Sequence, residues 1–301
     1  MRHDRDDSRF DPHRRPPRPG KPSPPRRRGD KPPFPPKRKP PRPPPRGPAA
    51  GETTSWEHVA SWYDRLVGEE GSDYHRNVIL PAAERMLDPQ ADEKVLDLCC
   101  GQGVFCRMLA ARGVRHVVGA DASESLIASA RQRGPAHVRY AVADARDAAA
   151  IPDRPFDAAA CLMAVHDVDD LPALFATLAA ALRTGGRAVV IFLHPCFRIP
   201  RQSSWEWDDQ KRTQYRRLDR YASDMAIPIA THPGRGGDEH TVFFHRPLAT
   251  CLNALGAAGL AVVAAEELLS HRVSQPGGHS RGENRARQEF PVFLALKAVK
   301  L

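Results

Sequence analysis

From residue 94 to the end of the chain, short apolar segments alternate with amphipathic ones. Short runs rich in Val, Ile, Leu and Ala predict buried β-strands, and apolar positions spaced three or four residues apart predict helices. The predicted strands are residues 94–100, 116–121, 138–144, 156–165, 187–193, 260–268 and 290–299. The predicted helices are residues 55–67, 74–87, 103–113, 122–134, 171–186 and 246–259.

This alternation of strand and helix predicts a parallel sheet that is covered by helices on both faces. The last two strands differ, because residues 270–289 between them show no clear helical period, and strands joined by a loop are usually antiparallel. We therefore expect an α/β fold: a Rossmann-like seven-stranded sheet, mostly parallel, with an antiparallel last strand and helices on both faces.

The first 50 residues break this pattern. They hold 16 Lys and Arg against 5 Asp, together with 17 of the 30 prolines. The rest of the chain holds 29 basic and 31 acidic residues, so the formal charge of +9 comes from this segment. It has too little apolar surface to offset the entropy of ordering. We expect a disordered Pro/Arg-rich basic tail over residues 1–52 and one folded domain over residues 53–301.

The charge of the tail permits contact with a nucleic acid or another acidic partner through residues 1–50, and a solvated tail with no single partner fits equally well. No apolar segment resembles a signal peptide or is long enough to span a bilayer, so we expect a cytoplasmic protein without membrane contact. The six cysteines form no CxxC pair, so the sequence predicts neither a metal site nor a disulfide framework.

A glycine-rich bend, CCGQG, follows the first predicted strand. In an open parallel sheet, ligands bind beyond the carboxyl ends of the strands. Gly101 and Gly103 let the backbone turn tightly and approach a ligand closely. Asp97, Asp121 and Asp144 lie at the ends of the first three predicted strands, and an acid at the second can bind both ribose hydroxyls. The three acids are therefore expected to lie along one nucleoside.

These residues carry a family resemblance. VLDLCCGQG resembles the first motif of class I S-adenosylmethionine-dependent methyltransferases, normally VLDLGCGTG, and GADAS and VADAR resemble their second and third acidic motifs. The resemblance covers about residues 55–301 and implies methyl transfer with S-adenosyl-L-methionine as cofactor. By position it implies a cofactor site formed by Tyr63, Arg76, Asp97, Cys99, Gly101, Gln102, Gly103, Asp121, Ala122, Asp144, Ala145 and Met163.

Within that site the resemblance implies individual roles. Asp97 is expected at the methionyl amino end, Asp121 at the ribose and Asp144 at the adenine amine, with Met163 beside the adenine. Family architecture places Tyr63 and Arg76 near the methionyl carboxylate. The first glycine of the family motif is cysteine here, so its side chain narrows the approach to the cofactor.

Two rival readings of the bend are weaker. A redox or metal pair at Cys99 and Cys100 is disfavoured, because adjacent cysteines chelate poorly and no third ligand is near in sequence. A nicotinamide dehydrogenase is disfavoured because the third glycine of its fingerprint is Cys106 here, and because Asp97 would repel a pyrophosphate. Both cysteines of the bend are therefore expected to line a cavity.

The residues that act on the acceptor are harder to predict, because methyl transfer depends mainly on alignment in a dry site. His166 and His194 follow the fourth and fifth strands and are the candidate catalytic residues, as a base or a substrate anchor. Either could instead satisfy backbone groups at a strand end. Residues 196–245 form an aromatic-rich insertion that is expected to cap the substrate.

We expect a methyltransferase of a small molecule, by in-line displacement. An RNA or protein methyltransferase that uses the basic tail is an alternative. A cofactor-binding protein without transfer activity, which Cys99 makes conceivable, is another.

Overall fold

The computed structural model describes residues 56–230 and 240–301. The predicted disordered tail, residues 1–52, lies outside the described residues, as does part of the predicted cap, residues 231–239. No helix in the described ranges has the length and the apolar character needed to cross a membrane.

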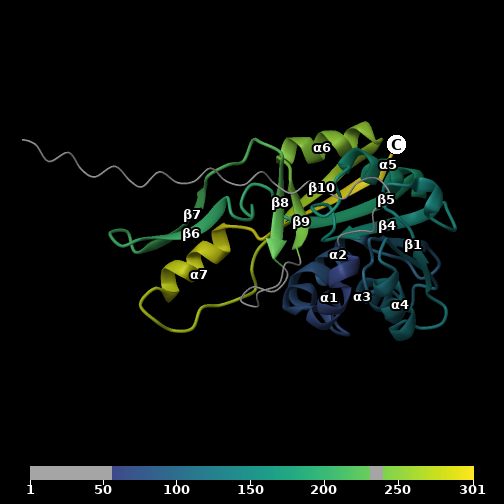
Figure 1. Cartoon of the computed structure of the whole chain (residues 1–301), viewed down its shortest axis with the longest axis horizontal. Helices are drawn as coiled ribbons and strands as arrows, with labels where there is room; N and C mark the ends of the chain where they lie inside the picture. Colours follow the sequence, from purple (N-terminus) through teal and green to yellow (C-terminus); the bar gives the residue numbers. More distant parts are fainter. Residues whose placement is uncertain (1–55, 231–239) are drawn as a thin grey trace, which may run out of the picture. The chain divides into compact units, whose positions relative to one another are not determined.

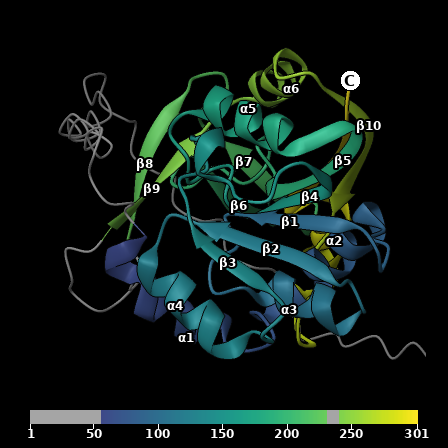
Figure 2. The ribbon, with the colours of Figure 1, turned by 90° about the vertical axis from the view of Figure 1, so that its right-hand side faces the viewer.

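A seven-stranded sheet in the order β10-β11-β5-β4-β1-β2-β3 forms the centre of the domain (Figures 1 and 2). Its strands are β1 Lys94–Leu98, β2 His116–Asp121, β3 Arg139–Val142, β4 Phe156–Leu162, β5 Leu182–Leu193, β10 Leu260–Leu268 and β11 Phe293–Lys300. Neighbouring strands are parallel except at β11, which pairs antiparallel with both β10 and β5. The predicted fold class is therefore confirmed.

The helices are η1 Glu57–Val59, α1 Ala60–Val67, the π-helix η2 His75–Ile79, α2 Leu80–Leu87, α3 Val104–Ala111, α4 Glu124–Arg133, η3 Ala148–Ala150, α5 Leu171–Ala181, α6 Leu248–Ala257 and α7 Ser280–Glu289. Ser123 caps α4, because its side chain accepts a hydrogen bond from the backbone N–H of Leu126.

Two apolar cores lie on the two faces of the sheet. Successive residues of β1 alternate between them: Val95 belongs to the core under α2 and α3, and Leu96 belongs to the core under α5 and α6. Figure 2 shows α5 and α6 on one side of the sheet and α3 and α4 on the other. Strands that are buried on both faces have continuous apolar sequences. The sequence pattern predicted these strands for that reason.

The strand order reverses between β1 and β4. After β1 the chain adds β2 and β3 on one side, and then returns to add β4 and β5 on the other. At such a switch point the loops after the two central strands diverge and leave a crevice beyond their carboxyl ends. The bend after β1 and the loop after β4 therefore meet at the place where this sheet can bind a ligand.

Two predictions about elements need correction. The helix predicted over residues 171–186 ends at Ala181, because Leu182 is already extended and pairs with Phe156 of β4. Residues 270–289 contain α7, although they lack an apolar period. This helix packs through Gly282, whose α-carbon lies so close to the Trp207 ring that a β-carbon would be 2.7 Å from it.

The insertion at residues 196–245 contains four strands that the sequence pattern did not reveal. They form two antiparallel hairpins, β6 Ser203–Asp208 with β7 Thr213–Leu218, and β8 Met225–Ala230 with β9 His240–His245. Figure 1 shows α7 beside β6 and β7. A small apolar core of Ile199, Ile227 and Phe243 lies at β8 and β9.

A first prediction concerns the packing of β2. A β-carbon at Gly119 would lie 2.8 Å from Cys106 Sγ and 2.8 Å from the Tyr140 ring. We expect Gly119→Ala to lower the free energy of unfolding, measured by urea denaturation, by about 1–3 kcal/mol through overpacking. Gly256→Ala in α6 is the control. Its β-carbon meets open space, so it should raise stability by about 0.5–1 kcal/mol. Equal effects of the two changes would contradict this account.

Candidate functional site

A cavity of about 410 Å³ lies at the carboxyl ends of the central strands. Its wall includes the bend after β1, the ends of β2 and β3, the loop after β4, helix α1 and the hairpin of β8 and β9. Of the predicted site residues, nine line it: Tyr63, Cys99, Gly101, Asp121, Ala122, Asp144, Ala145, Met163 and His166. The structure thus brings together most of the residues that the sequence singled out.

Asp121 joins the bend to the start of α4. Its Oδ2 accepts a hydrogen bond from the backbone N–H of Gly101 at 2.9 Å, and its Oδ1 accepts one from that of Ser123 at 2.9 Å. Burial raises the pKa of this carboxyl. Gly101 has φ +55°, and a β-carbon there would lie 3.2 Å from the Tyr63 ring. The bare backbone of the bend therefore faces both a fixed carboxylate and an aromatic ring.

Asp144 is held by a cation. Its Oδ2 lies 2.6 Å from Arg146 Nη2, and Arg146 Nη1 lies 2.9 Å from Asp169 Oδ1. The hydrogen bonds from Arg146 lower the pKa of Asp144, so this side chain is an anion at neutral pH. Arg146 and Asp169 also line the cavity, although sequence reasoning did not include them.

Asp97, Gln102 and Gly103 do not line the cavity but support its bend. Asp97 is 2% exposed and accepts a hydrogen bond from Cys106 Sγ at 3.3 Å. Burial raises its pKa to about 7. The side chain of Gln102 donates a hydrogen bond to the carbonyl of Gly68. Gly103 has φ +80°, and a β-carbon at this position would clash with the Tyr140 ring.

Cys99 lines the cavity at the position of the first glycine of the motif. Its backbone has φ +62°, in the left-handed region that favours glycine. The thiol packs against the core under α5 and α6. A hydrogen bond with Cys161, together with burial, raises the pKa of Cys99 well above its usual range, so it stays a neutral thiol. The cysteine therefore occupies a glycine conformation and turns its side chain toward the core.

Aromatic side chains of η1 and α1 cover one side of the cavity. Trp56, Trp62 and Tyr63 all line it, and the rings of Trp56 and Tyr63 meet edge to face with centroids 5.1 Å apart. Burial raises the pKa of Tyr63, so its hydroxyl stays neutral. The two tryptophans were not among the cofactor-binding residues that the resemblance implied. Their only signal in the sequence was the aromatic content of an amphipathic helix.

The continuous segment of η1 and α1 is fastened to α4 at both ends. At the start, the carboxylate of Glu57 accepts hydrogen bonds from the hydroxyls of Ser123 and Ser125. At the other end, Arg133 Nη2 donates to Asp64 Oδ2 at 2.7 Å, and the two side chains form a two-pronged ion pair. These contacts join segments almost 70 residues apart and hold the aromatic side chains over the cavity.

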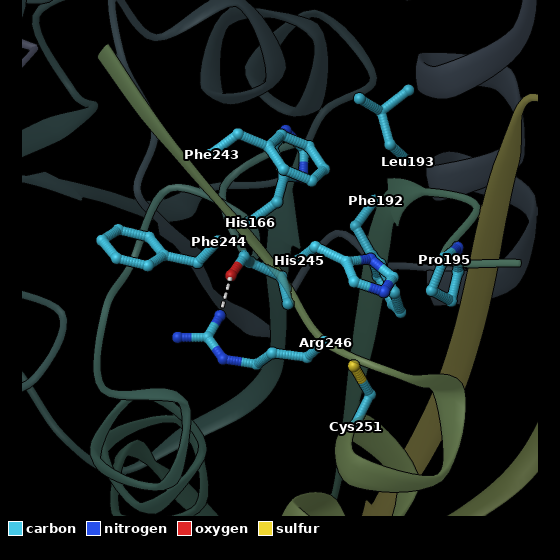
Figure 3. A pocket seen from close by; sticks show the side chains of 10 residues that line it. His166, Phe192, Leu193, Pro195, Phe243, Phe244, His245, Arg246 and Cys251 are labelled. Atoms are coloured by element: carbon cyan, nitrogen blue, oxygen red, sulfur yellow. Dashed lines mark hydrogen bonds between the residues drawn. The ribbon is translucent and has the colours of Figure 1, made fainter. Parts of the chain in front are cut away.

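His166 lies where the loop after β4 meets β9. Its backbone carbonyl accepts a hydrogen bond from the N–H of Phe244 at 2.7 Å, and its ring lies 4.8 Å from that of Phe243 at an interplanar angle of 30°. Burial and Arg246 lower the pKa of His166 to about 3, so the imidazole is neutral. Figure 3 shows the imidazole beside Phe243, with Arg246 directed at a backbone carbonyl, that of Val165.

Two predicted residues lie away from the cavity. His194 is 2% exposed, has its Nε2 2.9 Å from Glu267 Oε1, and accepts at Nδ1 from the backbone N–H of Cys196. Arg76 is exposed and donates to the carbonyl of Gly71. Its neighbour His75 lines the cavity instead, with a pKa that burial lowers to about 4.

Known proteins share this architecture. Residues 95–186 match the family model of a methyltransferase domain. The crystal structure of an S-adenosylmethionine-dependent methyltransferase from Mesorhizobium loti is 31% identical, covers 73% of this chain and 96% of its own, and superposes with a TM-score of 0.57.

Two curated relatives have named reactions. A demethylmenaquinone methyltransferase from Clavibacter sepedonicus is 35% identical over 138 residues, which is 44% of this chain and 54% of that protein. A malonyl-[acyl-carrier protein] O-methyltransferase from Serratia marcescens is 33% identical over 149 residues, which is 48% of this chain and 55% of that protein. The chain thus spans little more than half the length of these two relatives.

A second prediction concerns the fastening of α1. Glu57→Gln and Asp64→Asn each remove the charge from one end of the contact with α4. We expect amide hydrogen exchange across α1 to become about fivefold faster in each variant, since a partly exposed charged contact contributes about 1 kcal/mol. Exchange in α6 should not change. Asp153→Asn, which breaks the pair with Arg139 elsewhere, is the control, and an equal effect of this variant on α1 would refute the assignment.

A third prediction concerns Asp97. Its pKa of about 7 in the folded protein exceeds the value of about 3.9 for a free aspartate, so the folded state retains a proton that the unfolded chain has lost. The contribution of Asp97 to stability must then fall as the pH rises. Without ligand, the unfolding free energy of the wild type relative to Asp97→Asn should fall by about 2 kcal/mol between pH 5 and pH 7.

Urea denaturation at several pH values measures this difference. Comparison with the variant is essential, because His75 and His166 have lowered pKa values and so shift stability in the opposite direction over the same range. A difference that does not depend on pH would mean that Asp97 is ionised when the protein is folded.

Proposed function

Because the chain belongs to the S-adenosylmethionine-dependent methyltransferase family, we propose that it transfers a methyl group from S-adenosyl-L-methionine to a small-molecule acceptor that binds in the same cavity. One observation carries this proposal: a single cavity of about 410 Å³ has fixed carboxylates in one part of its wall and apolar side chains in another. That volume is within the range of about 300–1,000 Å³ that is typical of small-molecule sites.

The residues of this cavity fit the cofactor. Asp121, Asp144 and Met163 all line this cavity. We assign Asp121 as the acceptor of hydrogen bonds from the ribose hydroxyls, and Asp144 and Met163 as the residues beside the adenine. The backbone at Gly101 leaves room that a β-carbon would take up against Tyr63. Asp97 does not line the cavity and accepts a hydrogen bond from Cys106 of α3, so we assign it no direct contact with the methionyl amino group. His194 and Arg76 have no part in this assignment, because they lie away from the cavity.

When bound, the cofactor supplies an electrophilic methyl group on a sulfonium centre. The protein then has to exclude water and align the acceptor, which can account for much of the reduction in barrier. Trp56, Trp62 and Tyr63 close the cavity on one side, and Phe243 and Phe244 close it on the side of the hairpin. His166 stands at the boundary between the apolar wall and the loop after β4, where a neutral imidazole can orient a polar group of the acceptor.

The names of the two curated relatives described above agree with a small acceptor. The demethylmenaquinone methyltransferase is named for a quinone, and the O-methyltransferase for a malonyl group on a carrier protein. An RNA or protein acceptor that binds through residues 1–50 involves a segment outside the described residues, and the shape of the cavity favours the small molecule.

A fourth prediction tests the cofactor site. Asp121→Asn keeps the shape of the side chain but removes its charge. Calorimetry should show that S-adenosyl-L-homocysteine, the demethylated product, binds about tenfold or more weakly, because a hydrogen bond to a charged group is worth about 1.5–3 kcal/mol. Asp153→Asn, which lies outside the cavity, is the control and should bind S-adenosyl-L-homocysteine as tightly as the wild type does.

Methyl transfer itself is tested by incubating the full chain with isotope-labelled methyl donor and a metabolite extract, followed by mass spectrometry. If the wild type, folded by circular dichroism, binds neither the donor nor its product at millimolar concentration, the proposed function is wrong.

A further inference from the structure

The hairpin side of the cavity is apolar except for Thr241 of β9. The other side chains that the end of β5, the segment after it, β8 and β9 contribute are Leu193, Pro200, Ile229, Ala230, Val242, Phe243 and Phe244. Phe243 also belongs to the small core of the hairpin, with Ile199 and Ile227. This wall is therefore a fixed surface with aromatic rings, suited to a flat apolar ligand.

Neither histidine near this wall carries a charge at neutral pH. Burial lowers the pKa of His166 to about 3 and that of His75 to about 4, so both imidazoles are neutral. Burial and the nearby Asp121 raise the pKa of Asp167 well above its usual range. Arg146 lines the cavity as well, but two carboxylates already pair with it. An anionic acceptor would find no free cation among these groups, and burial of an unpaired charge is costly.

His166 offers one polar edge to this space. Its Nδ1 is sealed from solvent and has no hydrogen-bond partner among the described residues. The side chain remains 11% exposed and lines the cavity, so the accessible edge of the ring is the one that carries Nε2. That atom lies 3.9 Å from Asp167 Oδ2, which is too far for a hydrogen bond. Nε2 is therefore available to a ligand.

The ring of His166 cannot easily turn away. Its backbone is hydrogen-bonded to β9 through Phe244, and its face packs on the ring of Phe243 (Figure 3). Behind it lies a second cavity of about 20 Å³, which has room for roughly one water molecule. A polar atom fixed in this way at the edge of an apolar wall selects for the position of one polar group on an otherwise apolar molecule.

We propose that the methyl acceptor is an uncharged, flat, apolar molecule that carries a hydroxyl group, and that this hydroxyl hydrogen-bonds to Nε2 of His166 while the ring system lies against Phe243. This inference rests on the proposed function. It makes His166 a specificity-determining contact, and it excludes acceptors whose anionic or cationic group would enter the apolar part of the cavity.

Three naphthalene derivatives of similar size provide the test. They are 2-naphthol, which is neutral with a hydroxyl, 2-methoxynaphthalene, which is neutral without a hydrogen to donate, and 2-naphthoate, which is an anion. Calorimetry is performed on the full chain saturated with S-adenosyl-L-homocysteine at pH 7. We expect 2-naphthol to bind about tenfold or more tightly than 2-naphthoate, because the anion must be buried without a partner. It should also bind about fivefold or more tightly than 2-methoxynaphthalene.

Two variants separate the hydrogen bond from the apolar wall. His166→Phe should bind 2-naphthol and 2-methoxynaphthalene equally, within about twofold, since the polar partner is gone. His166→Asn keeps a hydrogen-bonding group, so it should retain part of the preference for 2-naphthol over 2-methoxynaphthalene. This variant replaces His166→Phe in the test if His166→Phe is unstable. His245→Asn is the control. His245 lines the smaller cavity and not the larger one, so the wild-type preferences should persist.

The outcomes separate this inference from the proposed function. Normal binding of S-adenosyl-L-homocysteine with equal or tighter binding of 2-naphthoate would overturn the acceptor class and leave the methyltransferase proposal intact. An unchanged preference for 2-naphthol in both His166 variants would overturn the role of Nε2. Failure to bind S-adenosyl-L-homocysteine at all would instead contradict the proposed function.

Discussion

The site depends on one sharp bend of the backbone after β1. Three of its residues, Cys99, Gly101 and Gly103, have φ between +55° and +80°, a region that costs little for glycine and more for any residue with a β-carbon. Two hydrogen bonds keep the bend in this shape. The carboxylate of Asp121 accepts one from the backbone N–H of Gly101, and the carbonyl of Cys100 accepts one from the backbone N–H of Gly103. The consequence of the bend is a short stretch of peptide at the switch point of the sheet, where Cys99 and Gly101 line the cavity.

The wall of the cavity is assembled from segments that no local pattern connects. The segment of η1 and α1 covers the bend because Glu57 and Asp64 bind the two ends of α4. Strand β9 reaches the loop after β4 through a backbone hydrogen bond at His166. The central sheet fixes where a ligand lies, whereas these peripheral elements determine what surrounds it. On the side of the fixed carboxylates, the contacts of Glu57 and Asp64 with α4 hold the aromatic side chains in place. On the side of the hairpin, the wall consists mainly of apolar side chains.

Sequence reasoning located the sheet and much of the site for the same physical reason. Strands buried on both faces are apolar throughout, and acids at their carboxyl ends must converge at one edge. The sequence pattern did not reveal helix α7, because this helix packs through Gly282 against Trp207 and has no apolar stripe. It did not reveal β6 either, because every residue of that strand is only partly buried. The roles given to His194 and Arg76 depended on tertiary position, which the sequence does not encode locally. The structure places both outside the cavity.

The distribution of charge also bears on which ligand the cavity retains. Asp97 and Asp167 are buried close enough to Asp121 for its charge to raise the pKa of each. Mutual repulsion of this kind is relieved by a ligand that brings positive charge, because an opposite charge favours the ionised carboxylates. A sulfonium donor carries one more positive charge than its demethylated product. The carboxylates should therefore favour the donor electrostatically over the product, while the uncharged wall near His166 leaves the acceptor to be selected by shape and by a single hydrogen bond.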